Sequence, residues 1–332
     1  IGAQLLAFGI ILNSLTGLPI IPSVFVSTAV VLAYTYLGGM LADIWADFFN
    51  MIVLAAGLLF IFPFFMKDIG GFAAARAAVP EHFFHFYPHD AGPLTWLNYV
   101  QALMIVGIGS LPAQDLLQRT MSARTPAISK WTSISAGFTY VIMGMIPVMM
   151  GIFGKLVLPQ SAGESILIDL SMKYLPGPMI ALMIGGLLAA IMSSADSAIL
   201  APSSIIGHNI VHYIKPNASE RFMLIFCRGS VIVVGLISLA LALYFQNIYR
   251  LCQEAWGILL TGVAAPMIAG VYWKRATTTG ALASASFGVV TWIVCKMVCP
   301  ADYPHNLMGF AASVLAMIVF SLLTRSDSKP EG

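Results

Sequence analysis

The segment Gly185-Gly-Leu-Leu-Ala-Ala-Ile-Met-Ser-Ser-Ala-Asp-Ser-Ala-Ile-Leu-Ala-Pro-Ser-Ser204 decides how the rest of the chain is interpreted. It lies in an apolar run from about Pro178 to Ile206, which is long enough to cross a bilayer as one helix. The middle of this run carries a carboxylate, Asp196. Burying an Asp at membrane depth costs roughly 2.5–3.5 kcal/mol on insertion scales unless another group pairs with it. The segment therefore predicts a membrane helix with a functional polar centre.

The polar residues of this segment follow helical spacing. Ala190, Ser193 and Ser194 stand at positions i, i+3 and i+4, and Ser193, Asp196 and Ser197 repeat the pattern. We expect one helix face to present two stacked clusters of oxygen atoms, which suit a small hard cation such as sodium. The alternative for the serines alone is a close helix–helix contact that interhelical hydrogen bonds stabilise. The carboxylate of Asp196 favours the cation site over that alternative.

The composition of the whole chain indicates a polytopic membrane protein. Of its 332 residues, 59% are hydrophobic and only 9% are charged. Soluble domains carry about 25% charged residues, so they are excluded as a class. The mean hydropathy of +0.90 agrees with that conclusion. The formal net charge of +2 is too small to indicate nucleic acid as a partner.

Ten apolar segments are expected to be membrane helices, so the predicted fold class is all-α. Turn-forming residues separate several of them, including Gly17 to Pro19, Gly38-Gly39 and Pro216-Asn217. The ten segments run approximately over residues 1–18, 22–39, 44–66, 95–115, 131–155, 178–206, 222–244, 250–272, 279–299 and 306–324.

The distribution of Lys and Arg predicts the orientation of the chain. Ten of the 16 basic residues fall in one set of alternate loops and six in the opposite set. The set of ten lies mostly in short loops, such as those that hold Arg119, Lys215 and Lys274, where the positive-inside rule applies best. We therefore expect that side to face the cytoplasm of a multi-pass protein in the cell (inner or plasma) membrane.

The segment 95–115 contains a second irregular centre. Gly107, Gly109 and Pro112 fall within six residues, next to Ser110. In a helix interior Gly costs about 1 kcal/mol and Pro about 3 kcal/mol relative to Ala. A helix broken at membrane depth survives where the freed backbone lines a cavity or meets protein, and such breaks mark substrate sites in transporters. A simple kink that serves packing is the alternative.

A few other polar residues lie within the apolar segments. Asp47 lies one turn inside the segment 44–66, and it could share its depth in the membrane with Asp196. Tyr140, Gln253 and Glu254 are candidate cavity-lining groups, although a satisfied core tyrosine is an equal alternative for Tyr140.

Four stretches of the sequence, taken together, are specific enough to indicate a protein family. They are Tyr36-Leu-Gly-Gly-Met-Leu-Ala-Asp-Ile-Trp-Ala-Asp47, Gln114-Asp-Leu-Leu-Gln-Arg-Thr120, Ala189 to Ser204, and Ala265 to Gly280. With them the chain resembles the sodium/solute symporter family, whose fold is the leucine-transporter fold of two inverted five-helix repeats. The stretches from Ser193 to Ser197 and from Lys215 to Ser219 look most like choline-type members of the family. Those members carry an aromatic residue just before Gln114, where this chain has Ala113.

The resemblance implies that residues 1–332 form a single transmembrane transporter domain. Residues 1–66 would end the first repeat, 95–272 would form the second, and 279–324 would be accessory helices. About three helices would precede Ile1, among them a broken helix that supplies further backbone oxygens to the sodium site. Residues 1–332 by themselves would then hold only part of that site.

The resemblance also implies roles for individual residues. The carbonyl of Ala190 and the hydroxyls of Ser193 and Ser194 match the principal sodium site of the family. Asp47, with Ser197 and Asp196, would form a second cation site. The residues that match the solute cavity of the family are Gly109, Ser110, Tyr140 and Gln253.

These observations predict a transporter and not an enzyme. We expect sodium-coupled symport of a small polar organic solute by alternating access, with Na+, the solute and the lipid bilayer as partners. Two alternatives stay open. One is a non-transporting sensor on the same fold. The other is an intramembrane serine hydrolase with Ser110 as its nucleophile, but no membrane-depth His stands ready as its base.

Overall fold

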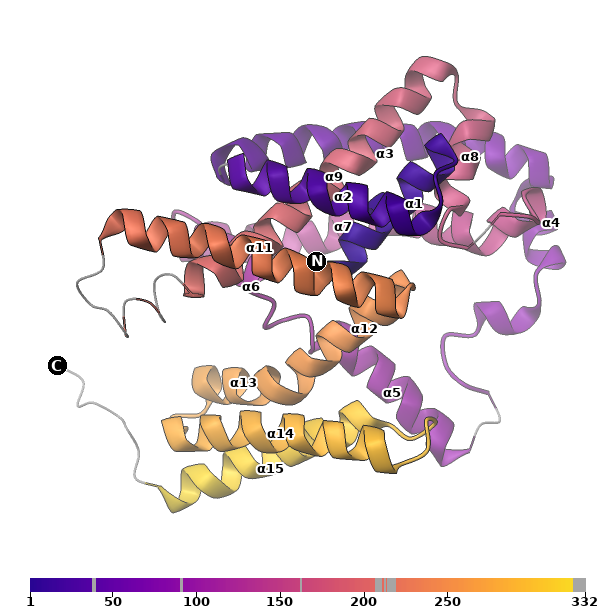
Figure 1. Ribbon diagram of the computed structural model, residues 1–332. Coiled ribbons are helices and arrows are strands. Elements are labelled where there is room, and N and C mark those ends of the chain that lie inside the picture. The colour runs from indigo at the N-terminus through magenta and orange to yellow at the C-terminus, as the bar shows by residue number, and fades with distance from the viewer. Residues whose placement is uncertain are drawn as a thin grey trace. The chain divides into compact units, whose positions relative to one another are not determined.

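The computed structural model describes residues 1–37, 40–89, 92–161, 163–206, 211, 213 and 219–324, and this part of the chain is helical, without a strand (Figure 1). The helices are α1 Gly2–Thr16, α2 Ile20–Leu37, α3 Met40–Ile69, α4 Gly71–Ala78, η1 Glu81–Phe84, α5 Pro93–Gly107, α6 Gln114–Met121, α7 Pro126–Val157, α8 Ile166–Tyr174, α9 Gly177–Ile205, α11 Glu220–Phe245, α12 Ile248–Leu259, η3 Leu260–Ala264, α13 Ala265–Tyr272, α14 Thr278–Val298 and α15 His305–Leu323. The predicted breaks at Gly38-Gly39 and Pro216-Asn217 lie outside the described residues.

Seven of these helices are long and apolar enough to cross a membrane, or eight if the bent pair α1 and α2 is counted as one span. The seven include α3, α7, α9, α11, α14 and α15, together with the continuous stretch Ile248–Tyr272. The helices α1 and α2 turn by 119° relative to each other. The predicted number of ten spans is therefore not confirmed, although the all-α membrane class is. Helices satisfy their own backbone hydrogen bonds, which is why such apolar runs fold this way in lipid.

The chain divides into two compact units. The first comprises Ile1–Phe83 and Ala123–Leu251, and the second comprises Phe84–Ser122 and Cys252–Gly332. In the first unit α9 packs against α1, α2, α3 and α11. A core of buried side chains, including Leu5, Val31 and Ile199, lies between these helices.

Local signals in the sequence set several helix boundaries of the first unit. Gly17 ends α1 with a positive φ of 71°, a conformation that glycine adopts without strain. Thr125 and Ser219 accept hydrogen bonds at their side chains from Ile128 N and Phe222 N, so they cap α7 and α11. The short helices α4 and α8 lie in connections that the hydropathy pattern alone did not resolve.

The second unit is built around an irregular span. Within Ile248–Tyr272, the residues Leu260–Ala264 form a π-helical turn between α12 and α13. Here α13, α14 and α15 run side by side (Figure 1). A Cβ on Gly288 of α14 would lie 1.9 Å from the carbonyl oxygen of Thr261, so glycine is required at this contact. The π turn was not predicted from the sequence.

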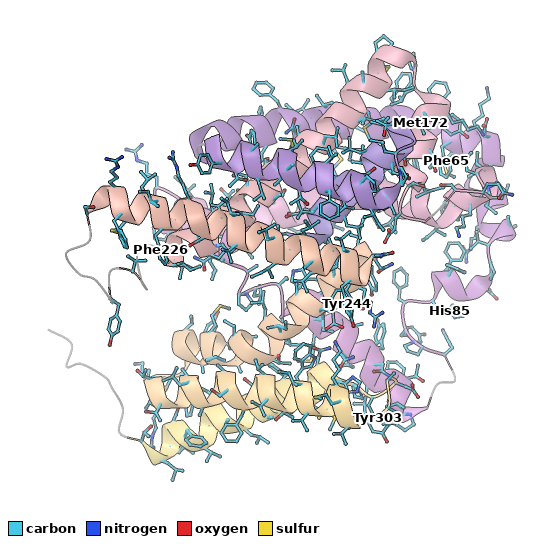
Figure 2. The ribbon with its side chains drawn as sticks, viewed as in Figure 1. Phe65, His85, Met172, Phe226, Tyr244 and Tyr303 are labelled. Carbon is cyan, nitrogen blue, oxygen red and sulfur yellow. The ribbon has the colours of Figure 1, made fainter. Side chains whose placement is uncertain are left out.

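Large apolar side chains cover much of the outer surface. On α11, Phe226 is 45% exposed and Tyr244 is 80% exposed, whereas Phe65 on α3 is fully buried (Figure 2). Soluble proteins bury most such residues, because water penalises contiguous apolar surface. Their exposure along helices of spanning length is what a lipid environment permits.

Candidate functional site

Glycines bring α3 and α9 close together in the first unit. A Cβ on Gly57 of α3 would lie 2.5 Å from the sulfur of Met183, and a Cβ on Gly186 of α9 would lie 3.2 Å from Val53. Small residues at such positions allow two membrane helices to approach closely. The consequence is that polar groups further along the two helices also meet.

The hydroxyl of Ser193 lies at the polar contact between α3 and α9. It donates to Oδ1 of Asp47 on α3 and lies 3.1 Å from the carbonyl oxygen of Ala190, one turn earlier on α9. Ser193 is only 2% exposed. Three oxygen atoms from two helices therefore lie around one buried point, and two of them belong to residues predicted for the principal sodium site. Hard oxygen ligands of this kind suit sodium.

Asp196 lies one helical turn beyond Ser193 and is fully buried. Its neighbours on α9 include Ala195 and Ile199, which are also fully buried and belong to the core of the first unit. Burial of a carboxylate in apolar surroundings disfavours its charged form unless a positive group compensates it. The structure thus places Asp196 in the buried core of the first unit, and its role as a cation ligand stays a prediction.

Exposure divides the remaining predicted ligands. Ser194 is exposed, whereas Ala190 and Ser197 are half-buried. Ser193 and Asp196 therefore belong to the buried side of α9, and Ser194 belongs to a more open side. The described residues do not include a group of three His, Cys, Asp or Glu side chains that could hold a metal ion.

Sequence reasoning missed Asn50, which lies one turn after Asp47 on α3. Its side-chain Nδ2 is buried without a hydrogen-bond partner among the described residues. Buried polar groups usually have a partner, so each exception needs an explanation. The spacing i, i+3 from Asp47 was the signal that could have identified Asn50 as part of the same helix face.

The predicted helix break lies in the second unit. The helix α5 ends at Gly107, and the chain turns through residues 108–113 before α6 begins at Gln114. A Cβ on Gly109 would lie 2.5 Å from the carbonyl oxygens of both Ile105 and Trp256. The backbone at Gly109 thus reaches α12, which only glycine permits.

Three of the four predicted solute residues belong to this unit. Ser110 turns its hydroxyl back to the carbonyl oxygen of Val106, at 2.6 Å, and Gln253 is half-buried on α12. Gln253 precedes Trp256 by three residues, so it lies on the side of α12 that approaches Gly109. Tyr140 belongs to α7 of the first unit and is 81% exposed.

A second group of polar contacts in this unit was not predicted, although Glu254 was a candidate cavity-lining residue. Oε1 of Gln101 accepts the backbone N–H groups of Asn306 and Leu307, at 2.9 and 3.2 Å, and so caps the start of α15. Lys296 forms an ion pair with Glu254. No short-range pattern could have indicated these pairs, because 205 residues separate Gln101 from Asn306 and 42 separate Glu254 from Lys296.

An all-α membrane chain with a broken helix and a buried oxygen-lined helix contact has the architecture of a secondary transporter. A sequence model of the sodium:solute symporter family matches residues 1–288. The chain therefore belongs to the sodium:solute symporter family.

Individual relatives support this assignment. The sodium/proline symporter of Haemophilus influenzae is 30% identical over 330 residues, which is 91% of this chain and 63% of that protein. The high-affinity proline transporter PutP of Bacillus subtilis is 27% identical, over 99% of this chain and 71% of that protein. The high-affinity choline transporter 1 of Caenorhabditis elegans is 27% identical, over 88% of this chain and 53% of that protein. The chain thus spans from about half to seven tenths of the length of these relatives.

A solved structure confirms the fold. The substrate-bound outward-open state of a Na+-coupled sialic acid symporter superimposes with a TM-score of 0.70 at 18% sequence identity. The match covers 98% of this chain and 71% of that one. The predicted leucine-transporter-like fold is thereby confirmed.

Proposed function

We propose that the protein carries a small polar organic solute into the cell together with sodium, by alternating access. The observation that carries this proposal is the contact between Ser193 of α9 and Asp47 of α3, beside the carbonyl of Ala190. A cation bound between the Asp47 carboxylate on α3 and the oxygens of Ser193 and Ala190 on α9 would hold these two helices together. Coupling between ion and solute then needs only about 1–3 kcal/mol.

The principal sodium site in this proposal consists of the carbonyl of Ala190 and the hydroxyls of Ser193 and Ser194. Sodium at this point would accept the oxygen lone pair of Ser193, while the Ser193 proton stays directed at Asp47. Asp47, Ser197 and Asp196 would form the second cation site. Full burial of Asp196 supports this assignment, because a cation offsets the cost of burying its charge.

The solute site in this proposal is the turn after α5. The backbone at Gly109 and the hydroxyl of Ser110 lie where the helix ends and carbonyl groups lose their helical donors. Gln253 would add a side-chain amide from α12. Tyr140 stays a predicted solute residue on the family resemblance alone. Proline and choline, the solutes named for two of the relatives, are the first candidates to measure.

The proposed organisation has residues 1–66 completing the first repeat, 95–272 forming the second, and 279–324 as accessory helices. The inward sodium gradient would supply the driving force, to which a membrane potential of about 100 mV adds roughly 2.3 kcal/mol for each charge. Asp47 and Ala190 would belong to different repeats, so an ion bound between them would sense their relative movement.

The test is uptake of labelled proline and choline into proteoliposomes that hold the whole natural protein, with and without an imposed sodium gradient. We expect accumulation of a solute only with the gradient. Asp47→Asn and Asp196→Asn should insert and remain folded, because an amide relieves a buried carboxylate of its charge, yet they should lose sodium stimulation. Wild-type sodium dependence in both variants would contradict the second cation site, and sodium-independent accumulation would contradict symport.

A further inference from the structure

The strongest feature outside the proposed transport site is an apolar groove on the second unit. It lies between α13 and α15 and has a volume of about 250 Å³. Ala265 and Ala269 of α13, one turn apart, line one side, and Phe310 and Val314 of α15 line the other. Its lining is almost wholly carbon, so it offers nothing to fix a polar solute.

Aromatic and basic residues mark one end of this groove. Tyr272 and Trp273 line it at the end of α13, and Lys274 and Arg275 follow directly. Tyr272 is 83% exposed. Trp and Tyr prefer the interface between lipid tails and headgroups, and basic residues just beyond it attract anionic headgroups. The groove therefore runs from apolar depth to a cationic mouth.

The cationic mouth is held in place by the end of α15. Thr277 caps α14, its backbone N–H donates to Oγ of Ser321 at 3.3 Å, and its hydroxyl lies 2.8 Å from that of Thr324. Arg275 donates from Nη2 to the carbonyl oxygen of Leu322 at 3.5 Å. These contacts fix the connection between α13 and α14 over the last turn of α15, where the groove ends.

The charges at the mouth are not neutralised within the described part of the chain. Lys274 and Arg275 are exposed, and neither makes an ion pair with a described acidic residue. The single carbonyl contact of Arg275 leaves most of its five N–H donors available. A phosphate group is the ligand that such an exposed pair of cations favours.

We propose that this groove binds one acyl chain of an anionic phospholipid, whose phosphate is held by Lys274 and Arg275. The span Ile248–Tyr272 is apolar and of membrane-crossing length, so acyl chains would meet the groove inside a bilayer, and the two cations would select the headgroup. Each basic residue near an anionic lipid improves its binding about fivefold. This site is separate from the ion contact of α3 and α9, which belongs to the other unit.

The test measures quenching of tryptophan fluorescence by phosphatidylglycerol or phosphatidylcholine with brominated acyl chains, with the protein in mixed micelles. The signal of Trp273 is the difference between the wild-type protein and Trp273→Phe, since both retain the other five of the six tryptophans. We expect half-maximal quenching of Trp273 at a mole fraction of phosphatidylglycerol at least fivefold below that of phosphatidylcholine. Ala269→Phe should reduce quenching by both lipids, because it fills the groove.

Charge variants separate selective binding from ordinary lipid contact. Lys274→Gln should reduce the preference for phosphatidylglycerol about fivefold, and Lys274→Gln with Arg275→Gln should abolish it. The matched control, Arg124→Gln with Lys130→Gln, removes two exposed cations from the first unit and should leave the preference intact. Equal quenching by the two lipids in the wild-type protein, or an equal loss in the control, would overturn the proposal. Absence of quenching by either lipid, together with a cross-linked dimer through this face, would show that a second copy covers the groove.

Discussion

The contact between α3 and α9 and the contact between α12 and its neighbours both bring polar groups between apolar helices, but they do so in different ways. In the first, polar side chains meet between unbroken helices, as Ser193 does with Asp47. In the second, the backbone itself is polar and irregular, at the turn after Gly107 and at the π turn Leu260–Ala264. Mutation can remove the side-chain oxygens of the first contact one at a time. The backbone contacts can be disturbed only through their glycines, where a methyl group does not fit.

The largest expected effect concerns the packing of the second unit. Gly288→Ala would place a Cβ 1.9 Å from the Thr261 carbonyl oxygen and 2.8 Å from Cβ of Ser313. Since neighbours on two sides must shift, we expect a loss of about 3 kcal/mol in stability, the upper end for overpacking. Thermal unfolding of the purified protein would measure this loss.

The control for that variant is Gly270→Ala, because a Cβ at Gly270 meets nothing within 4 Å. Here the alanine should stabilise the helix by up to about 1 kcal/mol through its higher helix propensity. We therefore expect the change in unfolding free energy to have opposite signs for Gly288→Ala and Gly270→Ala. Similar unfolding temperatures would show that the close approach of α14 to the π turn does not limit stability.

The next effect concerns the helix break. Gly109→Ala would bring a Cβ to 2.5 Å from the carbonyl oxygen of Trp256, whereas Gly107→Ala, two residues earlier, meets nothing within 4 Å. We expect about 2 kcal/mol of lost stability, together with weaker solute uptake, for Gly109→Ala alone. If the two variants behaved alike in solute-stabilised unfolding and in uptake, the backbone at Gly109 would have no special role.

A smaller effect is expected at the ion contact. Ser193→Ala should raise the sodium concentration for half-maximal uptake about tenfold, as expected for one lost interaction with a charged group. Ser194→Ala should also raise it, but only Ser193→Ala should lower the unfolding temperature, because Ser194 is exposed and Ser193 bonds to Asp47. Ser135→Ala serves as the control, since in the described part of the chain that hydroxyl donates to the carbonyl oxygen of Thr132, within α7. Unchanged sodium dependence in both site variants would contradict the assigned ligands.

The smallest effect concerns the ion pair of Lys296 and Glu254, whose side chains are 42% and 23% exposed. Water and salt screen such a pair, so a double-mutant cycle with Lys296→Gln and Glu254→Gln should give a coupling of about 0.2–1 kcal/mol. The coupling should fall as ionic strength rises. A value that salt does not change would indicate a buried structural pair instead.

The sequence by itself determined the class of the protein and the location of its polar centres. Apolar runs of spanning length must become helices in lipid, because each backbone group needs a partner within its own segment. Helical periodicity then placed Ser193, Asp196 and Ser197 near one another on α9, and the cluster of Gly107, Gly109 and Pro112 located the break.

Only the tertiary structure decided which of these groups face a partner. The burial of Ser193 and the exposure of Ser194 depend on where α3 lies, and that depends on glycines further along the two helices, Gly57 and Gly186. The capping of α15 by Gln101 and the π turn at Thr261 likewise depend on contacts between helices far apart in the chain. Local propensity cannot encode such contacts, because they arise when whole helices fit against one another at close range.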